Sequence, residues 1–290
     1  MTPRETPFSL RREQGKYILA VTLYGTIGVF LRQIRLPSEM AALCRGVIGS
    51  LFILAYLRLR GERLHREAIR ANLGWLVLSG VMLGLNWIFL FGAYIATTVA
   101  VASLCNYMAP LMVILLAPVL LHEPLEKRKL PYVAAAFAGI VLVSGVGGGS
   151  GATPLGVALG LLAALCFVGI VLCNRKLRGL PALDRSVVQL AVSALTILPY
   201  VLVRHGGLPL PSDGPTWAIL LMLGLLHTGV AYCLYFSGMA RLPVQQVAVL
   251  GYIEPVVSVL CSAAVLHEPL SAAGWTGAAL ILGAAVLSAR

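Results

Sequence analysis

Charged residues are scarce in this sequence and absent from long stretches of it. Asp, Glu, Lys and Arg make up 11% of the 290 residues, whereas hydrophobic residues make up 59%. Residues 71–121 contain no charged residue and no histidine, and neither do residues 130–174. The mean hydropathy of +0.90 lies outside the usual range of water-soluble domains. Because a bilayer-spanning helix needs about 20 mostly apolar residues, each stretch can hold two spans, and the sequence predicts a membrane protein.

Several chemical motifs are also missing. No GxxxxGK[ST] loop for a nucleotide phosphate occurs, HEPLE lacks the second histidine of HExxH, and no GxSxG turn is present. The six cysteines form no CxxC pair and no cluster with histidine, which favours small core residues over metal ligands. The sequence therefore predicts no metal and no cofactor. The cysteines are Cys44, Cys105, Cys166, Cys173, Cys233 and Cys261.

The apolar stretches predict an all-α membrane protein of ten helices. A transmembrane barrel would show alternating segments of about ten residues, but these segments stay apolar over twice that length. The gaps between them are short and leave no room for a soluble catalytic domain. The expected spans are residues 17–35, 38–58, 73–94, 98–121, 130–147, 155–174, 185–203, 216–239, 243–265 and 272–289.

The basic residues predict the orientation of these helices. If both termini lie in the cytoplasm, 18 of the 22 Lys and Arg residues fall on cytoplasmic segments, including Arg185 before the seventh span. Only Arg32, Arg35 and Arg204 fall outside, and Arg45 lies within the second span. This distribution follows the positive-inside rule and predicts a multi-pass protein of the inner (plasma) membrane. The net charge of +11 is not gathered into one basic domain, which argues against a nucleic-acid partner.

The chain also repeats itself at half its own length. LHEPL occurs at residues 121–125 and again at 266–270, an offset of 145 residues. The same offset superimposes matching residues in several other spans. These pairs are Tyr107 and Tyr252, Pro110 and Pro255, Leu115 and Leu260, Phe91 and Phe236, Gly84 and Gly229, and the acidic Glu39 and Asp184.

Two repeats of five spans must lie in opposite orientations, because five is odd. The predicted repeats are residues 1–147 and 148–290. EKRK follows the first LHEPL, as expected of a cytoplasmic loop, whereas SAAG follows the second. The LHEPL element favours a structural role, in which the glutamate suits the positive end of the helix that follows it. Inverted repeats are typical of secondary transporters, which expose one central site to each side in turn.

Two segments of the sequence resemble a known family. The segment GYIEPVVSVLCSAAVLHEPLSAAGWTGAALILGAAVLS, residues 251–288, is similar to the terminal signature of EamA-type members of the drug/metabolite transporter superfamily. Residues 106–145 repeat the pattern, with Ala109 in place of Glu254. The resemblance implies a substrate cavity between the repeats, with the fifth and tenth helices more peripheral. Ten-helix members of this superfamily include exporters of amino acids, some of them aromatic, and of other small metabolites.

Polar residues at bilayer depth are costly and mark candidate sites. Glu254 lies near the middle of the ninth span, where the adjacent Pro255 allows a break in the backbone hydrogen bonds. Its carboxylate could bind an amino group, carry a proton, or pair with Arg45. Arg45 itself favours a structural or ion-pairing role. His227, in the eighth span, could titrate or hydrogen-bond to a neighbouring helix.

Amides and aromatic rings complete the predicted substrate site, since rings can stack on an apolar substrate and amides can bind its charged groups. The candidates are Asn86, Trp87, Asn106, Tyr107, Tyr232, Tyr235 and Tyr252, together with His227 and Glu254. Each tyrosine alone is equally consistent with packing. The sequence leaves the oligomeric state open.

These features predict a secondary transporter that exports small metabolites, most simply amino acids, across the inner membrane. Its expected partners are a small-molecule substrate, the lipid bilayer and, if Glu254 couples transport to a gradient, protons. Two alternatives stay open: a membrane-embedded enzyme that uses Glu254 and His227 as acid and base, and a transporter of drugs or nucleotide-type metabolites.

Overall fold

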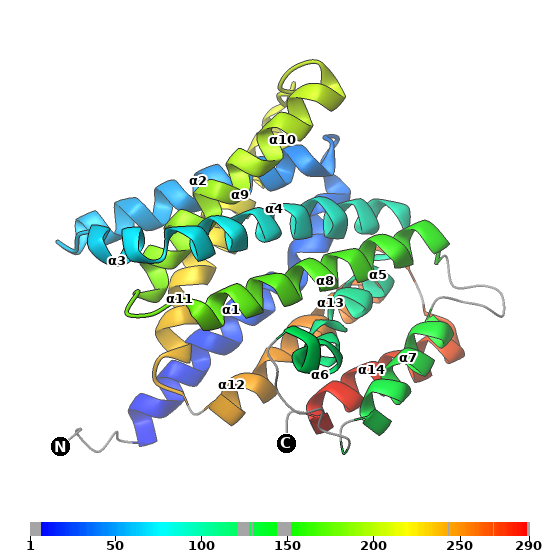
Figure 1. Ribbon diagram of the computed structural model, residues 1–290. Helices are drawn as coiled ribbons and strands as arrows, with labels where there is room; N and C mark the ends of the chain where they lie inside the picture. The colour runs from blue at the N-terminus through cyan, green and yellow to red at the C-terminus, as the bar shows by residue number, and fades with distance from the viewer. Residues whose placement is uncertain are drawn as a thin grey trace.

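The protein is a bundle of α-helices in which the apolar stretches of the sequence lie side by side (Figure 1). The computed structural model describes residues 7–120, 128, 130–143, 152–242, 244–268 and 270–288. The predicted boundary between the repeats, at residues 147 and 148, and the first LHEPL element lie outside these residues. Within the described part, five helices are long and apolar enough to cross a membrane.

The first repeat contains α1 (Pro7–Gln33), α2 (Ser38–Leu59), the short α3 (Arg66–Ala71), α4 (Leu73–Ala96), α5 (Val99–Asn106), α6 (Ala109–Leu120) and α7 (Leu130–Val143). The second contains α8 (Pro154–Lys176), α9 (Ala182–His205), α10 (Gly214–Gly224), the π-helix η2 (Leu225–Val230), α11 (Ala231–Met239), α12 (Val244–Gly251), α13 (Ile253–Ala264) and α14 (Ala272–Ser288). These elements account for the ten predicted spans. The first span begins ten residues earlier than predicted, because Arg11, Arg12 and Lys16 belong to α1.

Two of the predicted spans are broken at positions related by the repeat. The fourth span is interrupted at Tyr107, between α5 and α6, and the ninth at Tyr252, between α12 and α13. Each break lies three residues before a proline, Pro110 or Pro255. Proline has no N–H for the carbonyl four residues earlier, and its ring crowds that carbonyl, so the helix cannot continue unchanged. The prediction of one continuous helix over residues 98–121 was therefore wrong.

The repeats lie in opposite orientations and pack through one another. The second helices of the two repeats, α2 and α9, are antiparallel neighbours. Near the start of α2 the Glu39 carboxylate meets His205, at the end of α9, at 2.9 Å. Near the start of α9 the Asp184 carboxylate meets His65, beyond the end of α2, also at 2.9 Å. Glu39 and Asp184 occupy equivalent positions, so the same contact forms at both ends of the helix pair.

Contacts between the repeats occur in matched pairs. The third span of one repeat packs on the first span of the other, as α4 on α8 and α11 on α1. The fourth and ninth spans similarly pack on the first span of the other repeat, with α5 and α6 on α8 and with α12 and α13 on α1, and α5 also packs against α13. These pairs confirm the prediction of two inverted five-helix repeats. The parts of the broken helices nearest the breaks consequently lie inside the bundle.

The last helices of the repeats, α7 and α14, pack mainly on each other, and Figure 1 shows them side by side. Glycines allow the close approach. A Cβ atom on Gly277 would lie 2.5 Å from the carbonyl oxygen of Gly139, and one on Gly139 would lie 2.7 Å from that of Gly277. Small residues at helix interfaces permit this backbone contact in a membrane. The GxxxG glycines Gly80, Gly84, Gly156 and Gly160 likewise press against helices of the same chain.

We expect Gly277→Leu to lower the thermal midpoint of the purified protein in detergent. Overpacking of a well-packed interface costs about 1–3 kcal/mol. Gly283→Leu is the matched control, because Gly283 is also in α14 but a Cβ atom there meets nothing within 4 Å. Equal midpoints for the two variants, measured by nanoscale fluorimetry, would show that the α7–α14 contact does not limit stability.

Candidate functional site

Four tyrosines from opposite repeats meet between α1 and α11. The ring centroids of Tyr17 and Tyr235 lie 4.9 Å apart, those of Tyr24 and Tyr232 6.0 Å apart, and those of Tyr24 and Tyr235 5.9 Å apart. We call Tyr17, Tyr24, Tyr232 and Tyr235 the tyrosine cluster. Tyr232 and Tyr235 were predicted as site residues, whereas Tyr17 and Tyr24 were not. Their spacing of seven residues, two helical turns, places both on one face of α1 and could have indicated them.

Glu254 faces this cluster from the first turn of α13. Its hydrogen-bonding neighbour is Tyr107, at the other helix break, and the charge of Arg45 acts on its carboxylate. Tyr24 and Tyr235 also lie within electrostatic range of it. Gly25 permits this arrangement, since a Cβ atom there would lie 2.6 Å from the Glu254 carbonyl oxygen. The structure thus brings Glu254, Tyr107, Tyr232 and Tyr235 together where both helices break.

Arg45 is held in place by neighbouring side chains. Its Nε donates to the Thr228 hydroxyl at 3.0 Å, and its guanidinium lies 4.7 Å from the ring centroid of Trp87 and 5.4 Å from that of Phe91. Only 3% of the residue is exposed. Among the described residues no ion pair joins Arg45 to Glu254. These contacts support the predicted structural role of Arg45, with Trp87 as its stacking partner.

His227 lies in the wide turn of the π-helix η2. Its Nε2 is 3.0 Å from the Thr26 hydroxyl, and its Nδ1 is 3.4 Å from the Met222 carbonyl oxygen. Phe30 packs edge-on against the imidazole ring. Both ring nitrogens are therefore engaged by protein atoms, as expected of a histidine that joins neighbouring helices. A π-turn was not predicted, although such turns are frequent at functional sites.

The predicted amides join three helices. The Asn86 amide donates to Asn106 Oδ1 at 3.2 Å and to the Ala163 carbonyl oxygen at 2.8 Å, which ties α4 to the end of α5 and to α8. Tyr252 lies apart from the tyrosine cluster and packs on the apolar core around α5, α7 and α14. Asn86, Asn106 and Tyr252 are thus placed beside the helix breaks, and their roles as substrate contacts remain predictions.

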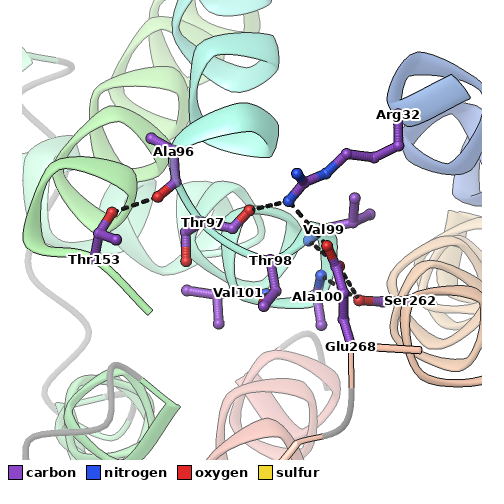
Figure 2. A network of polar contacts seen from close by, with 10 residues as sticks. All are labelled: Arg32, Ala96, Thr97, Thr98, Val99, Ala100, Val101, Thr153, Ser262 and Glu268. Atoms are coloured by element: carbon purple, nitrogen blue, oxygen red, sulfur yellow. Dashed lines mark hydrogen bonds and ion pairs between the residues drawn. The ribbon is translucent and has the colours of Figure 1, made fainter. Parts of the chain in front are cut away.

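A polar network lies where the end of α1 meets the start of α5 and the end of α13 (Figure 2). At the end of α1, the Arg32 guanidinium forms an ion pair of 2.9 Å with Glu268 and also donates to the Thr97 carbonyl oxygen. Glu268 Oε2 accepts from the Val99 backbone N–H at 3.0 Å and from the Ser262 hydroxyl at 2.8 Å. We call Arg32, Thr97, Val99, Ser262 and Glu268 the Arg32 latch. It joins α1 and the start of α5 to the end of α13.

The Arg32 latch shows that the predicted role of LHEPL was wrong about which helix the glutamate contacts. Glu268 does occupy the positive end of a helix, but that helix is α5 of the other repeat. The helix that follows Glu268, α14, begins at Ala272, and the Ser271 hydroxyl accepts from the Gly274 backbone N–H at 3.1 Å. A local sequence pattern could not reveal this contact, because Val99 and Glu268 are 169 residues apart.

Two surface grooves lie away from these residues. One, of about 1030 Å³, runs between the end of α2 and α3, and the other, of about 590 Å³, lies among the ends of α2, α4, α8 and α9. Neither is lined by the tyrosine cluster or by Glu254. The tyrosine cluster is the better candidate site, because its rings meet between α1 and α11 of opposite repeats, whereas both grooves lie at helix ends.

The two halves of the chain each match one model of the EamA-like transporter family, over residues 16–145 and 154–290. The chain belongs to the EamA-like transporter family. It is therefore a multi-pass membrane transporter with a small-molecule substrate, and not the membrane-embedded enzyme considered as an alternative.

Curated relatives support this assignment. The chain is 25% identical over 252 residues to the uncharacterized transporter YxxF of Bacillus subtilis, covering 84% of this chain and 79% of the relative. It is 29% identical over 221 residues to the aromatic amino acid exporter YddG of Ancylobacter novellus, covering 74% and 75%. It is 23% identical over 255 residues to the biotin transporter of Salmonella typhimurium, covering 84% and 81%.

One solved structure matches the fold over its whole length. The similarity has a TM-score of 0.65 at 25% sequence identity and covers 96% of both chains. The arrangement of helices in this EamA-like protein is therefore one that a related chain also adopts.

We expect Glu268→Ala to accelerate hydrogen exchange at Val99 and Ala100. The Val99 N–H loses its acceptor. The Ala100 N–H donates to the Ser262 hydroxyl at 3.3 Å, and this hydroxyl loses the carboxylate to which it donates. An increase of about tenfold corresponds to a loss of about 1.4 kcal/mol in local stability. Hydrogen–deuterium exchange mass spectrometry can measure this increase in the exchange rate. Glu62→Ala is the control, since Glu62 pairs with Arg60 on the exposed surface. Unchanged exchange in Glu268→Ala would show that the latch does not hold α5.

Proposed function

We propose that this protein exports amino acids, preferably aromatic or other apolar ones, across the inner membrane by alternating access. The tyrosine cluster with Glu254 carries the proposal, because it combines apolar rings with a carboxylate between two inverted repeats. Rings can stack on an apolar side chain, and the carboxylate can bind an ammonium group. Its similarity to an aromatic amino acid exporter supports the same substrate class.

The proposed transport cycle uses the repeat symmetry. The matched contacts between repeats can be exchanged when one repeat tilts against the other, so that a site between them opens to each face in turn. The Arg32 latch would then open when the site faces its end of the bundle. By the positive-inside rule that end is outside the cell, and both termini are cytoplasmic.

Glu254 is also the residue proposed to couple transport to protons. A carboxylate inside a membrane bundle can exchange a proton as its surroundings change between the two open states. The alternative is facilitated transport, in which the substrate moves down its own gradient. Direct measurements of flux distinguish the two schemes.

Uptake into proteoliposomes tests the substrate class. We expect labelled L-phenylalanine and L-tryptophan to enter faster than glutamate, a nucleoside, biotin or a cationic drug. Vesicles without protein and vesicles containing a denatured sample give the background. Selective uptake of a nucleoside or a drug would support the alternative substrate class, and preference for biotin would show that an amino group is not required.

We expect Glu254→Gln to reduce the flux of L-phenylalanine or to change its pH dependence. The amide has nearly the same shape as the carboxylate but cannot bind a proton at neutral pH or attract an ammonium group through charge. Glu67→Gln is a suitable control, because Glu67 lies in the exposed helix α3. Wild-type flux in Glu254→Gln at every pH would remove Glu254 from the mechanism.

A further inference from the structure

Arg185 presents an unpaired guanidinium to the tyrosine cluster. It lies in the first turn of α9, at the end of the bundle opposite the Arg32 latch, and it is half-buried. Its guanidinium carbon lies 5.3 Å from the ring centroid of Phe236, and it is within electrostatic range of Tyr232 and Tyr235. Its Nε is buried and has no hydrogen-bond partner among the described residues. The sequence suggested only a cytoplasmic charge at this position.

No neighbouring carboxylate compensates this charge within the described part of the chain. The adjacent Asp184 directs its Oδ2 to the backbone N–H of His65 at 2.8 Å and to the imidazole at 2.9 Å. Buried polar groups are nearly always hydrogen-bonded, and a charged donor without an acceptor is costly. An acceptor supplied by a ligand would remove this cost.

Arg185 differs from the other arginine near the cluster. Arg45 uses its Nε for Thr228 and is stacked on Trp87, so its orientation is fixed by the protein. Arg185 has the ring of Phe236 beside it, and its Nε has no polar partner among the described residues. A planar guanidinium fits a carboxylate through two parallel hydrogen bonds, a geometry that neutral side chains cannot supply.

Phe236 connects Arg185 to the tyrosine cluster. Its ring centroid lies 5.3 Å from the Arg185 guanidinium carbon, 5.2 Å from the ring centroid of Tyr235 and 5.8 Å from that of Tyr232. An aromatic substrate that packs on these rings would therefore place its carboxylate beside a cation. A molecule that lacks the carboxylate would leave Arg185 without an acceptor.

We propose that Arg185 binds the carboxylate of the transported substrate and selects for molecules that carry one. This inference rests on the proposed function. It identifies the substrate carboxylate as the group that is recognised at the start of α9. Phe236 and Tyr235 hold the apolar part of the substrate beside the guanidinium.

The test compares Arg185→Gln with wild type in proteoliposomes loaded with L-phenylalanine, using 3-phenylpropionate and 2-phenylethylamine as competitors. 3-Phenylpropionate lacks the amino group, and 2-phenylethylamine lacks the carboxylate. We expect Arg185→Gln to raise the KM for L-phenylalanine about tenfold to a hundredfold, as expected for a lost hydrogen bond to a charged group. 3-Phenylpropionate should stop inhibiting this variant, whereas inhibition by 2-phenylethylamine should persist.

Two further variants separate recognition from folding. Arg185→Lys keeps the positive charge and should restore part of the inhibition by 3-phenylpropionate. Arg178→Gln removes an exposed guanidinium just before α9 and should behave as wild type. An unchanged KM and unchanged inhibition in Arg185→Gln would overturn the inference while leaving the export function intact.

A binding measurement distinguishes failure of the inference from failure of the proposed function. 3-Phenylpropionate should raise the thermal midpoint of the wild-type protein in detergent but not that of Arg185→Gln. If this difference appears while no amino acid is transported, the carboxylate site stands and amino acid export fails. If wild type neither transports L-phenylalanine nor is stabilised by 3-phenylpropionate, both are overturned. If Arg185→Gln is unfolded, inhibition by 3-phenylpropionate that is weaker than wild type but still present in a folded Arg185→Lys supports the inference, and inhibition equal to wild type overturns it.

Discussion

Inside a bilayer, a backbone or side-chain polar group has no water to bind, and leaving it unsatisfied costs several kcal/mol. This constraint explains where the chain is irregular. The breaks at Tyr107 and Tyr252 and the π-turn around His227 face neighbouring helices, and the polar groups near them are paired within the bundle. Among the described residues, Thr97 Oγ1 and Arg185 Nε are the buried side-chain atoms without a hydrogen-bond partner, and Arg185 is the one of the two that carries a charge.

The two repeats share a backbone plan but differ in the charged groups placed on it. Ala109 occupies the position in the first repeat that Glu254 occupies in the second, and Leu177 corresponds to Arg32. The helix breaks and the acidic residues at the starts of α2 and α9 follow the symmetry. The central carboxylate and the Arg32 latch do not. The frame can thus alternate between equivalent states, whereas Glu254 comes from one repeat and the latch joins non-equivalent groups of both.

Long apolar stretches, the offset of 145 residues and the odd number of spans were enough to predict the fold, because each follows from bilayer thickness or from simple geometry. The break at Tyr107 was missed because residues 98–121 contain no charged residue, so the stretch looks like one continuous apolar span. Of the site, Glu254, Tyr107, Tyr232 and Tyr235 could be predicted as polar residues at bilayer depth. Tyr17 and Tyr24 were missed although their spacing of seven residues places them on one face of α1, and Arg185 could not be predicted, because it lies at the start of a span and only tertiary packing places it beside Phe236. The partner of Glu268 was equally hidden, because a contact across 169 residues leaves no local pattern.

The contact between α7 and α14 has a consequence for biosynthesis. α7 ends the described part of the first repeat, but the helix whose glycine backbone it packs on, α14, belongs to the end of the second repeat. α7 therefore cannot form its closest contact until α14 has been synthesised, so the two repeats are joined at this interface late in assembly.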